Sequence, residues 1–117
     1  MRPVISAERF EDLVVDALDR LPSWVQERLD NVEVLVEDEP ADGRPGLLGL
    51  YEGIPLTARG AGYSGVLPDR ITLFRRALVR LARDEDHLRD LVAETVVHEV
   101  AHFFGISDER LAELGWN

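Results

Sequence analysis

The chain has 117 residues, 23 acidic and 13 basic, a net charge of -10 and no cysteine. This length predicts one domain with a single core, residues 1–117. The acidic balance excludes nucleic acid as a partner, because a phosphate backbone would be repelled. No apolar run reaches the roughly 18–20 residues of a membrane span, and residues 1–12 do not resemble a signal peptide, so we expect a cytoplasmic protein without membrane contact.

Two helices are expected before the first strand. Ser6 is a suitable N-cap for a helix that runs to about residue 20, with apolar residues at helical spacing. Pro22 ends this helix and can begin a second, short helix that continues to residue 29. We expect both helices to contribute to the core.

A small sheet of about three strands is expected in the middle of the chain. Residues 32–37 are rich in β-branched side chains, residues 47–53 form a weaker candidate, and residues 70–74 form the third. A short helix over residues 75–83 follows. Helices at both ends and strands between them predict the α+β class, with the most informative helix near the C-terminus.

A glycine-rich segment lies between the second and third strands. Gly60, Gly62 and Gly65 match the spacing of a dinucleotide-binding fingerprint, but they neither open a helix nor lie in a βαβ unit. We therefore expect a mobile loop. Arg59 and Tyr63 either overhang a cleft or form part of a solvent-exposed connection.

The long helix that Asp84 or Asp86 can cap contains the motif H-E-x-x-H, made by His98, Glu99 and His102. The two histidines are one turn apart on the same face and can bind one metal ion, for which Zn²⁺ is the natural choice. Glu99 points sideways from them and is placed to act as a base on water. Both histidines lie outside the apolar arc of the helix, so they do not fit as buried packing residues. An ordinary polar helix face without metal is the weaker interpretation, because H-E-x-x-H with a Gly and an Asp at further fixed offsets is rare by chance.

The third metal ligand is expected just beyond this helix. Gly105 can adopt the positive φ that ends a helix, so the chain can turn and bring Asp108 back toward the metal. Glu109 and Glu113 are alternatives for this ligand. The residues after Asp108 are expected to form a last helical turn.

The extended motif, H-E-x-x-H-x-x-G-x-x-D from His98 to Asp108, resembles the zinc signature of the zincin metallopeptidases. Together with the upstream segment Asp69–Phe74, it is similar to the small bacterial minimal zincin, or minimal matrix-metalloprotease-like, domain family, over roughly residues 30–117. The resemblance implies a small zincin core with a strand beside the cleft, and zinc-dependent peptidase activity. The only methionine is Met1, so the methionine turn of metzincins is missing, and the short segment after Asp108 implies a one-sided groove.

The expected reaction is hydrolysis of a peptide or protein substrate, with Glu99 moving the proton from water to the leaving amine. A peptide could dock on a sheet edge formed by residues 70–74, and Arg59 or Tyr63 could assist as an oxyanion donor. The main alternative is a zinc-stabilised domain that binds a peptide or protein without cleaving it. Other hydrolases fit less well: the acidic charge and Glu99 argue against a metal-dependent ribonuclease with a similar helical histidine pattern, and the third ligand of peptide deformylase is a cysteine, which this chain lacks. The sequence leaves substrate preference and oligomeric state open.

Overall fold

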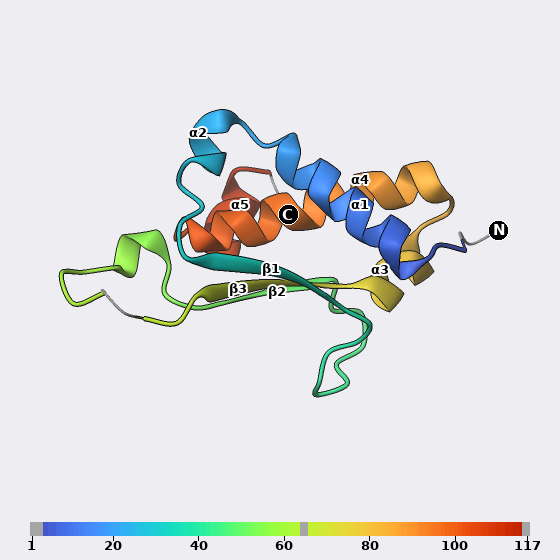
Figure 1. The fold of residues 1–117 in the computed structure, drawn as a ribbon, viewed down its shortest axis with the longest axis horizontal. Coiled ribbons are helices and arrows are strands. Elements are labelled where there is room, and N and C mark those ends of the chain that lie inside the picture. The colour runs from blue at the N-terminus through green and yellow to red at the C-terminus, as the bar shows by residue number, and fades with distance from the viewer. Residues whose placement is uncertain (1–3, 64–65, 116–117) are drawn as a thin grey trace.

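The computed structural model describes residues 4–63 and 66–115 and shows a three-stranded mixed sheet with helices packed over one face (Figure 1). The chain order is α1 (Ala7–Asp19), α2 (Ser23–Gln26), β1 (Val32–Glu37), β2 (Gly49–Glu52), a 3-10 turn (Leu56–Ala58), β3 (Asp69–Phe74), α3 (Arg75–Leu81), α4 (Glu85–Phe103) and α5 (Asp108–Glu113). The predicted α+β class, with about three strands and the motif helix near the C-terminus, is confirmed. In the part of the chain that the structure describes, none of the helices has the length and apolarity needed to cross a membrane.

The central strand of the sheet is β3, with the order β1-β3-β2. It pairs in parallel with β1, where Val34 opposes Ile71, and antiparallel with β2, where Tyr51 opposes Ile71. The expectation that residues 70–74 offer a free sheet edge is therefore wrong, because both edges of β3 are occupied by neighbours. The strand exposed beside α4 is β2.

The core lies between the sheet and the helices. Alternate strand residues face the helices, because side chains on a strand point to opposite faces in turn. Ile71 and Leu73 of β3 are almost fully buried there and meet Phe10 of α1 and Val96 of α4. In Figure 1, α1 and α4 lie across the same face of the sheet, and this single layer of helices holds α4 in place beside β2.

The ends of the elements follow local chemistry. The Ser6 hydroxyl accepts a hydrogen bond from the Arg9 N–H at 3.0 Å and caps α1, as predicted. The second helix, α2, ends at Gln26 instead of residue 29. Beyond it the backbone continues with bonds between residues three apart, and Asn31 then adopts a φ of 53° that turns the chain into β1.

Two further boundaries differ from the sequence prediction. The first strand residue of β2 is Gly49 and not residue 47, and α3 ends at Leu81 and not at residue 83. The early end of α3 has a clear cause, since Asp84 must adopt an extended backbone to cap α4. Its side chain accepts the His87 N–H at 2.8 Å.

Candidate metal centre and active site

His98 and His102 lie on the last turns of α4 and point to the same side, as their spacing predicts. Their Nε2 atoms are 3.2 Å apart, and their side chains are 32% and 24% exposed. They are therefore neither packed into the hydrocarbon core nor fully solvated. Two ring nitrogens this close can share one proton or one cation.

A tight turn returns the chain to these histidines. Gly105 has a φ of 86°, as predicted, and its N–H donates to the His102 carbonyl while the Ile106 N–H donates to the Ala101 carbonyl. This pair of bonds closes the last turn of α4 and reverses the chain. Ser107 then caps α5 by accepting the Arg110 N–H at 3.1 Å.

Asp108, the first residue of α5, is carried back to the histidines by this turn. Its Oδ1 lies 3.1 Å from the His98 Nε2 and 3.0 Å from the His102 Nε2. Glu109 does not belong to this group, and Glu113 instead pairs with Arg110 at 2.8 Å. Of the three carboxylates considered from the sequence, the structure brings Asp108 to the histidines.

The three ligand atoms form a nearly equilateral triangle that suits a tetrahedral cation. Nitrogen and oxygen ligands at zinc bonding distances are about 3.3 Å apart around a tetrahedral ion, a few tenths of an ångström more than the separations found here. The donor set, two imidazoles and a carboxylate, is typical of zinc sites that leave a fourth position open. Because the Asp108 side chain is 76% exposed, this open side is accessible to solvent and to a substrate.

Glu99 lies next to the triangle without belonging to it. Its side chain is buried, with 7% of its surface exposed. Burial raises the pKa of the Glu99 carboxyl, while the nearby His98 and His102 and a hydrogen bond from the Tyr51 backbone N–H act in the opposite direction. A carboxylate that holds a proton more tightly than usual is a stronger base.

The strand β2 encloses Glu99. The Leu48 carbonyl accepts the Phe74 N–H at 2.9 Å, so the alternation of an antiparallel pair turns the backbone groups of Gly49 and Tyr51 away from β3. Gly49 also allows a close approach to α4, because a Cβ at this position would lie 2.7 Å from the Thr95 Cγ2 and 3.2 Å from the Glu99 Cγ. An isolated glycine within a strand is the sequence signal that could have indicated this approach.

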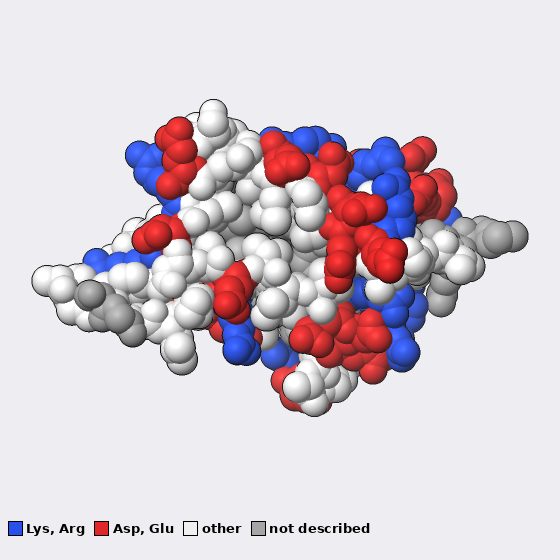
Figure 2. Space-filling view, in the orientation of Figure 1, with Lys and Arg blue, Asp and Glu red and all other residues white. Residues whose placement is uncertain are grey.

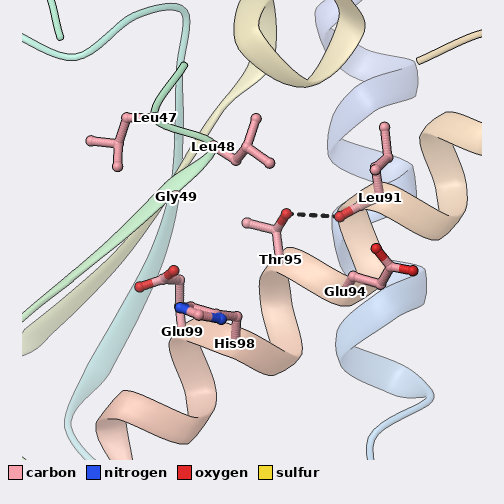
Figure 3. A pocket seen from close by; sticks show the side chains of 8 residues that line it. All are labelled: Leu47, Leu48, Gly49, Leu91, Glu94, Thr95, His98 and Glu99. Atoms are coloured by element: carbon pink, nitrogen blue, oxygen red, sulfur yellow. Dashed lines mark hydrogen bonds between the residues drawn. The ribbon is translucent and has the colours of Figure 1, made fainter. Parts of the chain in front are cut away.

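A pocket of about 530 Å³ opens between the start of β2 and α4, directly beside the motif (Figure 3). Figure 3 shows Glu99 pointing from α4 toward Gly49, and Leu48 extending toward Leu91 and Thr95. The lining residues come from these two elements: Leu47, Leu48, Gly49, Leu91, Glu94, Thr95, His98 and Glu99. Sequence reasoning identified only the last two.

Arg59 and Tyr63 have other partners. The Arg59 guanidinium is buried and donates to the Asp69 Oδ2 at 3.0 Å and to two backbone carbonyls, those of Ile54 and Asp30. It also lies 4.3 Å from the centre of the Tyr63 ring, and the Tyr63 hydroxyl accepts a hydrogen bond from Asn31. The structure gives no support for Arg59 as a residue overhanging the cleft.

The predicted glycine-rich loop is described only in part. Gly60 and Gly62 lie in a turn and not at the start of a helix, which agrees with rejecting a dinucleotide site, whereas Gly65 lies outside the described residues. The Tyr63 N–H closes this turn on the Gly60 carbonyl at 3.1 Å.

Comparisons with known proteins agree with this geometry. The model of a family described as zincin-like metallopeptidase matches residues 29–116. A solved structure of a conserved hypothetical protein from T. thermophilus is similar, with 26% identity and a TM-score of 0.60, over 93% of this chain and 99% of that chain. The comparison with curated proteins found no match.

Proposed function

Because the chain belongs to the zincin-like metallopeptidase family, we propose that it is a zinc-dependent peptidase in which Glu99 is the general base. His98, His102 and Asp108 would hold the ion. The observation that carries the proposal is the position of Glu99, a buried carboxylate beside a triangle of three ligand atoms that it does not join.

Bound zinc would supply Lewis acidity, polarising a peptide carbonyl and lowering the pKa of a coordinated water toward about 7. The chain supplies the proton transfers. The Glu99 carboxylate accepts a proton from the attacking water and then donates it to the amine nitrogen of the leaving fragment. Its burial beneath β2 keeps bulk water from competing for this proton and strengthens the interaction of Glu99 with charge in the site.

An extended peptide would bind along the free edge of β2. The backbone N–H and carbonyl of Gly49 face away from β3 and can pair with a peptide main chain, whatever its side chains. This replaces the docking edge expected at residues 70–74. A peptide bound along β2 would lie next to Glu99 and His98, because both residues line the same pocket as Leu47, which lies just before β2.

Zinc titration and peptide hydrolysis, measured on matched variants, test the proposal. Glu99→Gln should bind zinc like the wild type but lose hydrolysis by at least about 100-fold, the usual minimum for a general base. His98→Ala should lose zinc binding as well. Glu33→Gln, an exposed carboxylate on β1, removes the same charge and should retain both properties. Equal turnover by Glu99→Gln and the wild type would eliminate Glu99 as the base.

A zinc-stabilised binding domain is the second candidate. It is favoured by the strong exposure of Asp108, which places the ligand triangle at an open surface and not in a deep cleft. This candidate predicts that a peptide binds to the zinc-loaded protein and remains uncleaved after long incubation.

A further inference from the structure

The pocket beside the motif has two chemically distinct parts. Leu47, Leu48 and Leu91 are half-buried and form an apolar wall between β2 and α4. Glu94 is exposed, also lines the pocket, and lies one helical turn before His98 on the same side of α4.

Within the described part of the chain, Glu94 has no partner that accounts for its charge. Among residues 4–63 and 66–115, no ion pair or side-chain hydrogen bond of Glu94 is found. Two other acidic residues of α4 are paired, since Glu85 pairs with Arg9 and Asp86 with Arg89, whereas Asp90 is like Glu94 in having no ion pair among the described residues. The carboxylate at the pocket is therefore available to a ligand.

From this arrangement we propose that the pocket selects a basic side chain, that of lysine or arginine, in the residue beside the scissile bond. The proposal rests on the peptidase function above. The apolar wall would cover the methylene stem, and Glu94 would pair with the cationic end.

The spacing supports this assignment. Residues one turn apart on a helix have Cβ atoms about 5–6 Å apart, and the four-carbon stem of lysine spans a similar distance. A residue whose backbone lies at His98 can thus place its side-chain charge near Glu94. An aliphatic side chain would contact the leucines equally well but would leave the carboxylate unpaired.

The net charge of the chain also favours binding of a basic peptide. The chain carries a net charge of -10, and Figure 2 shows clusters of acidic side chains, many of them beside arginines, around an uncharged area on one face of the molecule. A basic peptide would be attracted to such a surface at low ionic strength.

The test uses two peptides of alanine and serine that differ at one position, lysine in one and norleucine in the other. Norleucine has the same stem without the ammonium group. Hydrolysis by the zinc-loaded wild type and binding to zinc-loaded Glu99→Gln are both measured, with cleavage sites assigned by mass spectrometry. The lysine peptide should be preferred about fivefold at low salt, as for a solvent-exposed ion pair. This preference should fall toward one in about 0.5 M salt, where surface charges are screened.

Glu94→Gln should reduce the ratio of lysine to norleucine to about one in both measurements, while Glu33→Gln should preserve it. A wild-type ratio of one or below, unchanged by Glu94→Gln, would overturn the selection of basic side chains and leave the peptidase function intact. Lysine preference in binding without cleavage of either peptide would support the pocket and refute the peptidase function. If neither peptide is bound or cleaved, both proposals fail.

Discussion

Gly105 lies so close to Thr57 that no side chain fits between them, because a Cβ built on Gly105 would overlap the Thr57 side chain. The contact joins the turn after α4 to the 3-10 turn Leu56–Ala58, which belongs to the connection between β2 and β3. Since the same turn carries Asp108 back to His98 and His102, this connection supports the position of the expected third ligand.

Gly105→Ala should therefore weaken zinc binding as well as folding. The residue would be strained at a φ of 86° and would also displace Thr57, so we expect a loss of stability of about 2–4 kcal/mol and a loss of zinc affinity of about tenfold or more. Gly43→Ala is the matched control, because Gly43 has a φ of 72° and nothing within 4 Å of an added Cβ. It should cost only about 1–2 kcal/mol and leave zinc affinity unchanged. Equal effects of both variants on zinc affinity would exclude a role for the Thr57 contact.

Asp108→Ala should reduce zinc affinity more than removal of either neighbouring carboxylate. Loss of a residue that only orients a zinc ligand usually lowers metal affinity by about 10–100-fold, so loss of a ligand itself should lower zinc affinity by about 100-fold or more. Glu109→Ala and Glu113→Ala should stay within about threefold of the wild type, because neither residue joins the triangle. Competition with a chromophoric chelator measures all three. A larger loss in Glu113→Ala than in Asp108→Ala would reassign the third ligand.

Gly49→Ala should push β2 away from α4. The added Cβ would lie 2.7 Å from the Thr95 Cγ2, so we expect a loss of about 1–3 kcal/mol and a fall in peptide hydrolysis without a comparable loss of zinc. Thr95→Ser removes the opposing methyl group and keeps the hydroxyl that donates to the Leu91 carbonyl. The double variant should recover part of both losses in thermal unfolding and turnover. Strictly additive losses would show that the Thr95 contact is not the cause.

Asp69→Asn should remove a stabilising contribution that depends on pH. Asp69 is 2% exposed, and this burial raises the pKa of its carboxyl. Hydrogen bonds from Tyr51, Ile54 and Arg59, together with the charge of Arg59, have the larger effect, so the pKa of Asp69 is lowered overall. A pKa lowered by folding stabilises the protein above the unfolded value of about 3.9, and the stabilisation is lost as the pH falls through the folded-state pKa. We expect a loss of about 3 kcal/mol at pH 7, since Arg59 is left buried without its partner.

The pH dependence of that loss is the decisive measurement. In urea unfolding, the difference between the wild type and Asp69→Asn should shrink below about pH 4, where the Asp69 carboxyl of the unfolded chain begins to gain its proton, and it should be lost as the pH falls through the lower folded-state pKa. Glu85→Gln, which breaks the exposed pair with Arg9, should lower the free energy of unfolding far less than Asp69→Asn at pH 7, because solvent screens this pair. A difference for Asp69→Asn that stays constant down to pH 2 would show that its charge does not stabilise the fold.

The parts of the site that the sequence predicts are those fixed by local geometry. A helix places His98 and His102 on one face, and Gly105 is the residue that can end that helix and return Asp108 to them. These relations extend over only eleven residues and require no knowledge of the sheet. The strand Val32–Glu37 is likewise predicted with its observed limits, because its β-branched residues act locally.

The surroundings of Glu99 could not be predicted in this way. Residues 70–74 have the stronger strand pattern, but strength of pattern says nothing about position in the sheet, and this segment is central. The short strand β2 takes the edge beside α4 through pairing that is distant in sequence. The burial of Glu99 and Thr95 follows from that pairing, and a helical wheel of α4 alone places both outside its apolar arc.

The three atoms of the proposed metal site and the Glu99 carboxylate thus depend on different ranges of the chain. His98 and Asp108 are ten positions apart in the sequence, so bringing them together costs little conformational entropy. The three atoms of the proposed metal site can therefore come together early in folding. Glu99 acquires its enclosure only when Gly49 and Tyr51, far earlier in the chain, have docked. Fraying of that outer strand would leave His98, His102 and Asp108 together but would expose Glu99 to solvent.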